Sequence, residues 1–196
     1  PDFIWIIKNL RENINIDILT NLNFDVDVFI NHINPQRLKR NAPYPSIRVS
    51  YHPGYMDLDK LVNKTLKLKE AGFSVGIFSV LYPPLLEKVE QAKEKCLKMG
   101  IDFRTKEFLG ELNKTIYGTY CYPKAVGKNK YQNCLCKTSE LIVGRDGNVY
   151  RCHHDFYKNF PPVGNLLNPD FEIQDIFRGC SYFGDCNPCD VKIKTN

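Results

Sequence analysis

The chain has 196 residues, 43% of them hydrophobic and 25% charged, and its 27 basic and 22 acidic side chains give a net charge of +5. This composition is typical of a globular protein with a hydrophobic core, and the densest basic segments, residues 37–40 and 60–69, are short enough to indicate a solvated surface rather than a nucleic-acid interface. No signal peptide is visible, and no apolar run approaches the ~20 residues that span a bilayer, so we expect a cytoplasmic protein that binds neither nucleic acid nor membrane.

The first 112 residues alternate helical and strand patterns. Strand-like segments begin near residues 14, 46, 73 and 101, and stretches with apolar side chains at helical spacing lie before and between them. The period of roughly 30 residues matches a strand–helix unit of a parallel sheet, which predicts an α/β fold with right-handed βαβ connections. The residues predicted to face inward on the four helices are Phe3, Ile6, Ile7, Leu10, Val26, Phe29, Ile30, Ile33, Leu58, Leu61, Val62, Thr65, Leu68, Leu85, Leu86, Val89, Ala92, Cys96 and Met99.

The ends of these elements carry recognisable residues. Asp57 is the predicted N-cap of the third helix and Gly72 its end, while Pro83 and Pro84 open the fourth helix. The nearly continuous apolar run at residues 73–81 predicts a strand covered on both faces. The predicted carboxyl ends of the strands, where parallel sheets bind ligands, are Thr20-Asn21, Ser50 to His52, Ser79 to Tyr82 and Glu107 to Glu111.

The pattern changes in the second half of the chain. Residues 113–133 are rich in Lys, Asn, Tyr and Gly, show little periodicity and are predicted to form a linker or crossing loop. The Asp146-Gly147 pair between Leu141–Val143 and Asn148–Tyr150 predicts a β-hairpin. Residues 171–177 predict two turns of helix, and we expect the remainder to be loops that carry cysteines.

Eight cysteines are the main chemical signal, at positions 96, 121, 134, 136, 152, 180, 186 and 189. Six of them lie in the last 63 residues, and the first 95 residues contain none. In a chain with the pattern of a cytosolic α/β protein, such clustering favours metal binding over a disulfide framework. Cys96 lies on the apolar face of a predicted helix and is expected to be a core residue, whereas Cys121 is either a ligand or a bystander.

The spacing of the cysteines predicts a shared metal site. A hairpin returns the chain to its start, so we expect Cys136 and Cys152 to lie close together, and the Cys186-x-x-Cys189 turn lets two thiolates face one metal centre. The predicted ligands are Cys136, Cys152, Cys186 and Cys189, with Cys134 and Cys180 as contenders. Four thiolates suit tetrahedral zinc or a 4Fe–4S cluster, and His153-His154 offers further zinc ligands, so spacing does not choose between the metals.

Two segments resemble the SPASM domain of radical SAM enzymes, in which a cysteine, a hairpin with Asp-Gly and a second cysteine begin an auxiliary 4Fe–4S site. The first runs from Cys136 to Cys152 and is CKTSELIVGRDGNVYRC. The second runs from Val163 and comprises VGNLLNPDFEIQDIF, followed by CSYFGDCNPC. The resemblance covers about residues 134–190 and implies that the cysteines hold an auxiliary 4Fe–4S cluster.

The upstream half is compatible with the partial (β/α)6 barrel of radical SAM enzymes, of which it would supply the last four strand–helix units. Residues 18–21 resemble the family's strand that ends in Thr-Asn-Gly, although Leu22 replaces the glycine, and residues 48–50 resemble the next strand. The site residues that the resemblance implies on the side of S-adenosylmethionine or the substrate are Thr20, Asn21 and Ser50.

The resemblance implies three segments. Residues 1–112 would be the carboxy-terminal part of the barrel, residues 113–133 a linker, and residues 134–196 a SPASM-like iron–sulfur domain. The intact enzyme would bind S-adenosylmethionine, receive electrons from a donor such as a flavodoxin or ferredoxin, and modify a small-molecule or peptide substrate by radical chemistry. No catalytic acid or base is assigned.

The sequence departs from the family in two places. The C-x-x-x-C-x-x-C motif that holds the S-adenosylmethionine-cleaving cluster is absent, and the chain starts at Pro1, so we interpret it as a fragment that cannot generate the radical alone. The usual ending, C-x2-C-x5-C-x3-C, is here Cys180-x5-Cys186-x2-Cys189, which favours one auxiliary cluster over two. Two alternatives stay open, namely a zinc-binding structural or interaction module fused to an α/β domain, and a secreted protein stapled by disulfides.

Overall fold

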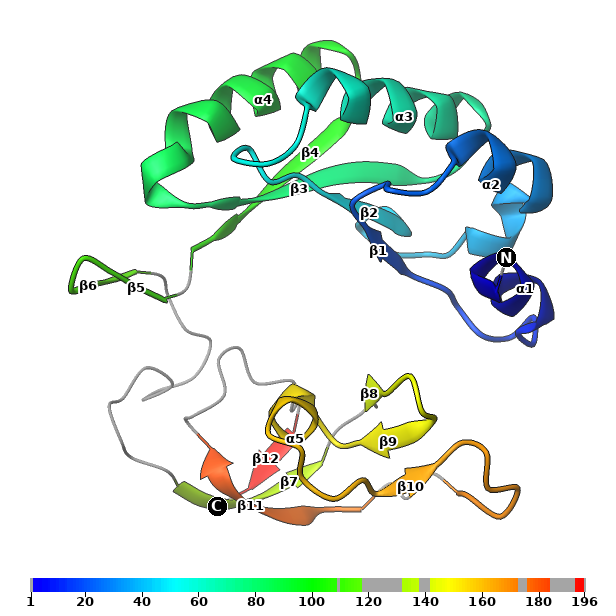
Figure 1. The fold of residues 1–196 in the computed structure, drawn as a ribbon, viewed down its shortest axis with the longest axis vertical. Helices are drawn as coiled ribbons and strands as arrows, with labels where there is room; N and C mark the ends of the chain where they lie inside the picture. Colours follow the sequence, from blue (N-terminus) through cyan, green and yellow to red (C-terminus); the bar gives the residue numbers. More distant parts are fainter. Residues whose placement is uncertain are drawn as a thin grey trace. The chain divides into compact units, whose positions relative to one another are not determined.

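The computed structural model describes residues 2–108, 110–117, 132–137, 142–172, 176–183 and 193–195. The chain forms two compact units, residues 1–117 and 118–196 (Figure 1). The elements of the first unit are α1 (Asp2–Asn9), β1 (Ile18–Thr20), α2 (Val26–His32), the 3-10 helix η1 (Pro35–Leu38), β2 (Ile47–Ser50), α3 (Leu58–Glu70), β3 (Val75–Leu81), η2 (Pro83–Leu85), α4 (Leu86–Lys98), β4 (Asp102–Glu107), β5 (Gly110–Leu112) and β6 (Thr115–Tyr117).

The first unit is built on a parallel four-stranded sheet. Its strands follow one another in the order β1-β2-β3-β4, and each connection between them carries a helix. Figure 1 shows α3 and α4 on the same face of this sheet, and α2 packs beside α3. The predicted alternation of strands and helices around a parallel sheet is therefore confirmed.

The ends of α3 follow the predicted chemistry. The Asp57 carboxylate accepts hydrogen bonds from the backbone N–H groups of Asp59 (3.0 Å) and Lys60 (3.1 Å), and so satisfies amides that the first helical turn leaves without a partner. Gly72, just beyond the helix, adopts φ +90°, a conformation that side-chain-bearing residues disfavour. The inward residues Leu61 and Leu68 are buried, as predicted.

The first strand is shorter than predicted. It begins at Ile18 rather than near residue 14, because the preceding segment forms a turn whose backbone carbonyls are bound by a side chain. The Arg37 guanidinium donates to the carbonyl oxygens of Leu10 (3.2 Å), Arg11 (3.1 Å) and Ile14 (3.0 Å). A strand pattern cannot reveal such a distant donor.

Some predicted inward faces are wrong. On α1 only Ile7 is buried, while Phe3 and Ile6 are 45% and 47% exposed. The helix α1 contacts α2 at its edge, where the Phe3 and Phe29 rings stack with their centroids 6.4 Å apart. On α4, Leu86 and Met99 at the two ends are also exposed.

The prediction that residues 73–81 are covered on both faces is wrong as well. Val75 and Ile77 are buried on the helical face of β3, whereas Val80 is 41% exposed. A continuous apolar run therefore marks a strand here without marking two covered faces.

Residues 113–117 of the predicted linker, which spans residues 113–133, lie in the first unit. Asn113 and Lys114 both have positive φ values, 49° and 65°, and join β5 to β6 as a tight antiparallel hairpin that belongs to the first unit. Residues 118–131 of that segment lie outside the described residues.

The second unit contains two small antiparallel sheets, ordered β10-β9-β8 and β11-β7-β12. Its elements are β7 (Gln132–Lys137), β8 (Ile142–Val143), β9 (Asn148–Tyr150), α5 (His153–Tyr157), β10 (Gly164–Asn165), β11 (Arg178–Phe183) and β12 (Ile193–Thr195). The predicted hairpin is confirmed, with Val143 opposite Val149 across β8 and β9.

Two predictions for this unit are wrong. The described residues at the ends of the predicted 171–177 helix are not helical, and residues 173–175 lie outside the described residues. Cys134, Cys136 and Cys180 lie on strands rather than on loops, because β7 pairs with segments far along the chain. Such long-range pairing leaves no local pattern in a strand of six residues.

Candidate functional site

The predicted S-adenosylmethionine or substrate residues lie at the carboxyl ends of β1 and β2. Thr20 is the register partner of Val49, and Ser50 that of Phe78. The Thr20 hydroxyl accepts a hydrogen bond from the Leu22 N–H (3.0 Å), so this side chain shapes the loop after β1. The Asn21 side-chain oxygen also shapes this loop, since it accepts a hydrogen bond from the Asn23 N–H (3.2 Å).

The loop after β1 is fixed to α3 by one lysine. Lys64 donates to the carbonyl oxygens of Leu22 (2.6 Å) and Phe24 (3.2 Å). Leu22 itself is 1% exposed and has φ +55°, in the left-handed region that favours glycine. This is the position at which the resembling family has its glycine.

Ser50 lines a hollow of about 170 Å³ on the face of the sheet opposite the helices. The lining residues are Leu19, Arg48, Ser50, Tyr51, His52, Phe78, Ser79, Val80 and Lys106. Leu19 is 68% exposed and supplies apolar surface, and Lys106 supplies positive charge, whereas the Arg48 guanidinium is paired with Asp17 (3.1 Å). The hollow suits a ligand with an apolar body and an acidic group.

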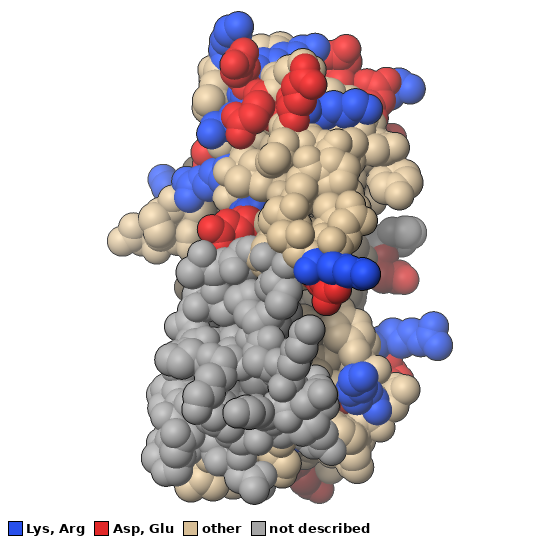
Figure 2. All heavy atoms as spheres, turned by 90° about the vertical axis from the view of Figure 1, so that its left-hand side faces the viewer, with Lys and Arg blue, Asp and Glu red and all other residues tan. Residues whose placement is uncertain are grey.

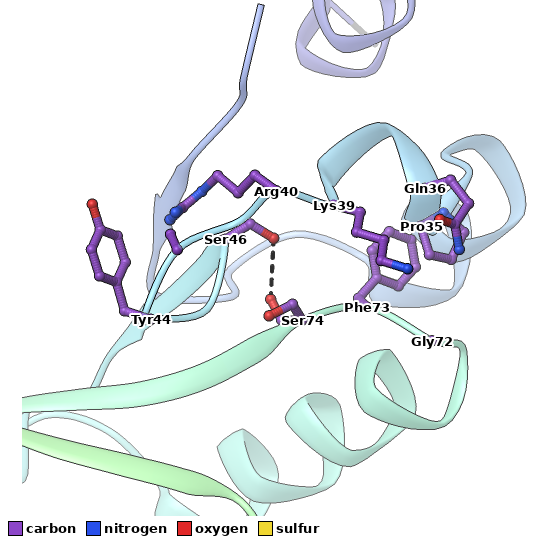
Figure 3. A pocket seen from close by; sticks show the side chains of 10 residues that line it. Pro35, Gln36, Lys39, Arg40, Tyr44, Ser46, Gly72, Phe73 and Ser74 are labelled. Carbon is purple, nitrogen blue, oxygen red and sulfur yellow. Dashed lines mark hydrogen bonds between the residues drawn. The ribbon is translucent and has the colours of Figure 1, made fainter.

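A larger hollow of about 340 Å³ lies at the amino ends of β2 and β3 (Figure 3). The Ser46 hydroxyl donates to the Ser74 carbonyl oxygen (3.3 Å) along its floor. Arg40 also lines it, but this guanidinium is paired with Asp17 and lies over the Tyr44 ring, 4.5 Å from its centroid. The arginine is therefore part of a structural clasp at the edge opposite the one where parallel sheets bind ligands.

The lysine-rich helix α3 carries interspersed negative charge. Lys67 pairs with Asp27 (2.7 Å), Lys60 with Asp57 (3.8 Å), and Asp59 with a lysine of α4. Figure 2 shows blue and red side chains mixed at the end of the molecule that carries α3 and α4. Within the described residues, no helix combines the length and the apolar character needed to cross a membrane.

Three predicted or contending ligands meet at the sheet formed by β7 and β11. Cys180 on β11 is the register partner of Cys134 on β7, and Cys136 follows two positions along the same strand. Directly opposed residues of an antiparallel pair have Cα atoms about 4.5–5.5 Å apart. Cys136 is 8% exposed.

The side chain of Arg151 links the turn that follows Cys152 to the strand that carries Cys180. The Arg151 guanidinium donates twice to the Asp155 carboxylate, from Nε and from Nη2 (3.2 Å), and a third time from Nη1 to the Gly179 carbonyl oxygen (2.9 Å). The hydrogen bond to Asp155 raises the pKa of Arg151, whereas desolvation lowers it. Electrostatic interactions with Cys152 and Cys180 also raise this pKa. Both sulfurs therefore lie within electrostatic range of one guanidinium.

Burial and charge act in opposite directions on the Cys152 thiol. Burial raises its pKa most and the Asp155 charge also raises it, while the Asp155 and His154 backbone amides and the Arg151 charge lower it. The net shift favours the neutral thiol.

The structure leaves the predicted ligand set incomplete. Cys121, Cys186 and Cys189 lie outside the described residues. Within the residues that the structure does describe, no three His, Cys, Asp or Glu side chains converge tightly enough to hold a metal ion. Of the described cysteines, Cys96, Cys152 and Cys180 carry free thiols.

Cys96 is a core residue, as predicted. Its side chain is 0% exposed, in the cluster that α4 forms with the sheet. Burial raises the pKa of its thiol to about 11, so it is neutral at ordinary pH and a poor ligand.

Sequence reasoning missed Arg151 and Asp155. The sequence signal for this pair is that the two residues are four positions apart, a spacing at which side chains meet on a helical turn, and that Arg151 is adjacent to the predicted ligand Cys152.

No family model, no curated protein and no solved structure matches this chain.

Proposed function

We propose that this chain is the carboxy-terminal portion of a radical SAM/SPASM enzyme, in which the second unit holds an auxiliary 4Fe–4S cluster. The observation that carries the proposal is the segment from Cys136 to Cys152 with its Asp-Gly hairpin, followed by the Gly164-Asn165 pair. These are the features of the family that the sequence resembles.

The geometry of the hairpin supports this proposal. The two resembling segments pair with each other, because Gly164 and Asn165 form β10 against β9. The Asn165 amide donates to the Asn148 side chain (2.9 Å) and to the Asp146 carbonyl oxygen (3.2 Å). The Gly-Asn motif thus stabilises the turn of the hairpin that precedes Cys152.

The sheet of the first unit supports the barrel half of the proposal. Strands in sequential order, with α3 and α4 on one face, are what a segment of a (β/α) barrel requires. A doubly wound sheet instead reverses its strand order and places helices on both faces. In the proposed barrel, Thr20, Asn21 and Ser50 face S-adenosylmethionine or a small-molecule or peptide substrate.

The cysteines of the second unit supply thiolates, which are the donors that iron–sulfur clusters use. Cys134 and Cys180 are register partners across β7 and β11, and the Arg151 guanidinium next to Cys152 donates to the Gly179 carbonyl oxygen next to Cys180, so segments that carry cysteines are linked in this unit. The proposed ligands come from Cys136, Cys152, Cys186 and Cys189, with Cys134 and Cys180 as contenders. When bound by four thiolates, such a cluster supplies one-electron transfer, with a flavodoxin or ferredoxin as the donor to the intact enzyme. The protein's part is to hold the thiolates, exclude water and set the local charge.

Anaerobic reconstitution with iron and sulfide tests this proposal. We expect iron and acid-labile sulfide in equal amounts, and a broad visible absorbance. Cys152→Ser and Cys189→Ser should each lose most of the iron, since a missing thiolate leaves the cluster open. Cys96→Ala is the matched control and should keep the full iron content, because Cys96 is buried in the other unit.

Two results would count against the proposal. Zinc without iron or sulfide in anaerobically purified protein would support the alternative, a zinc-binding structural or interaction module. Unchanged iron content in both serine variants would refute the ligand choice.

A further inference from the structure

Two arginines share a single carboxylate beside the larger hollow of the first unit. Arg40 pairs with Asp17 through Nε, and Arg48 pairs with the same carboxylate through Nη2 (3.1 Å). Both guanidinium groups also lie over the Tyr44 ring, with their central carbons 4.5 and 5.1 Å from its centroid. Two positive charges and one negative charge meet here, so one positive charge is left in excess.

The Arg40 side chain is buried, and its hydrogen bonding is incomplete. It is 10% exposed, and its Nη2 has no hydrogen-bond partner among the described residues. In the same part of the chain, the buried Nε of Arg48 has none either. A buried charged donor without an acceptor is costly, because it loses its hydration and gains no bond in return. A clasp that served stability alone would pair both donors, and the unpaired donors therefore indicate that a further acceptor belongs at this place.

The hollow that Arg40 lines has the character of an anion site. Its volume is about 340 Å³, and none of the described residues that line it is acidic. Lys39 supplies a second positive charge, and Gln36, Ser46 and Ser74 supply polar groups. The wall of the hollow therefore favours a small polar ligand with negative charge.

The two cationic side chains reach different parts of the hollow. In Figure 3, Arg40 extends toward Tyr44, whereas Lys39 extends toward Phe73. A ligand that pairs with both side chains therefore carries its negative charges on two separate groups rather than on one.

We propose that this hollow binds a small polar dicarboxylate, with one carboxylate at Arg40 and the other at Lys39. A guanidinium fork matches a carboxylate through two hydrogen bonds, and a lysine ammonium acts as a point charge. Two negative charges balance the two positive charges in excess here, one from Lys39 and one from the arginine pair. The Tyr44 ring over Arg40 is 39% exposed, and its displacement gives the carboxylate access to the buried Nη2. The site lies at the amino ends of β2 and β3 and does not depend on the proposed function.

Isothermal titration calorimetry on the full chain tests this site with succinate, glutarate and adipate. We expect saturable binding, tightest for the chain length that spans the two cations. The monoamide of that dicarboxylate should bind roughly tenfold more weakly, since one charged contact is lost. Glycerol 3-phosphate carries its negative charge on a single group and should also bind more weakly than the dicarboxylate.

Substitutions at the two cations test which residues hold the ligand. Lys39→Gln should weaken binding of the dicarboxylate by about tenfold. Lys98→Gln is the matched control and should leave binding unchanged, because Lys98 is an exposed lysine of the same unit that does not line the hollow. Arg40→Lys keeps the charge without the fork of donors and should also weaken binding, with its fold checked by circular dichroism.

Three results would overturn the inference. The first is the absence of saturable binding for all three dicarboxylates, and the second is equal affinity of Lys39→Gln and Lys98→Gln. The third is binding of the monoamide or of glycerol 3-phosphate as tight as that of the dicarboxylate, which would contradict a site for two separate carboxylates. If Arg40→Lys does not fold, the comparison of the two lysine variants decides.

Discussion

Leu22 has a backbone conformation that leucine rarely adopts. Its φ of +55° lies in the left-handed region, and its side chain is nevertheless 1% exposed. The conformation is held by the Thr20 hydroxyl on its N–H and by Lys64 on its carbonyl oxygen. The strain of the left-handed region is on the order of 1–2 kcal/mol, while burial of a leucine side chain contributes about 2–3 kcal/mol, so the burial prevails.

This balance predicts an unusual order of mutational effects. Leu22→Ala should destabilise the first unit by about 3 kcal/mol, because it removes the buried side chain and keeps the strain. Leu22→Gly should be roughly 1 kcal/mol less harmful, because glycine adopts a positive φ freely. Urea unfolding followed by circular dichroism measures both changes.

Leu68 supplies the matched comparison. It is 0% exposed in the last turn of α3, where its backbone is helical and glycine is disfavoured, so Leu68→Gly should be more harmful than Leu68→Ala. The same order at Leu22 as at Leu68 would contradict the proposed balance of strain and burial.

At the scale of single residues, the sequence was informative where a residue type has one physical task. Asp57 could be predicted as an N-cap and Cys96 as a core residue from their positions alone. The positive φ of Leu22 could not, because it depends on a hydroxyl before it and a lysine on another helix.

Among the elements, β10 depends on a close approach that only glycine permits. A Cβ on Gly164 would overlap the Cδ2 and Cε2 atoms of the Phe171 ring. Gly164→Ala should therefore displace the ring and destabilise the second unit by about 1–3 kcal/mol, the usual cost of overpacking. Thermal unfolding of the iron-loaded chain would report the change.

The second unit also offers a control for this glycine. Gly179 on β11 has open space at the position of a Cβ, so Gly179→Ala should have little effect. Adding Phe171→Ala to Gly164→Ala should make the glycine substitution nearly neutral, because the clashing ring is gone. Equal losses for Gly164→Ala with and without the Phe171 change would show that the clash is not the cause.

Element boundaries could be predicted where the signal is local. The hairpin of β8 and β9 follows from Asp146-Gly147, and the end of α3 from Gly72. The start of β1 could not be predicted, because Arg37 binds the carbonyls before it from another element. Nor could β5 and β6 be predicted from Asn113-Lys114, a less common hairpin turn than Asn-Gly.

At the scale of the whole molecule, the two units differ in how their sheets are encoded. The first unit repeats a strand and a helix, and each strand pairs with the next one along the chain. The second unit pairs β7 with β11 and β12, which are far from it in sequence, and its sheets are short. Non-local pairing leaves no periodicity in the sequence, which explains why the first sheet could be predicted and the cysteine-bearing sheet could not.

The same difference predicts which unit the proposed cluster would stabilise. Ligands on separate segments gain a shared anchor when iron and sulfide bind, and binding to the folded form alone adds directly to stability. In hydrogen exchange of the full chain, the amides of β7, β9 and β11 should therefore exchange more slowly after anaerobic iron loading. The amides of β2 and β3 should not change, because their unit has its own core. Cys152→Ser, treated in the same way, should show no added protection in either unit. Added protection of β2 and β3 equal to that of β7 would contradict a cluster confined to the second unit, and no change in β7 would contradict its coupling to folding.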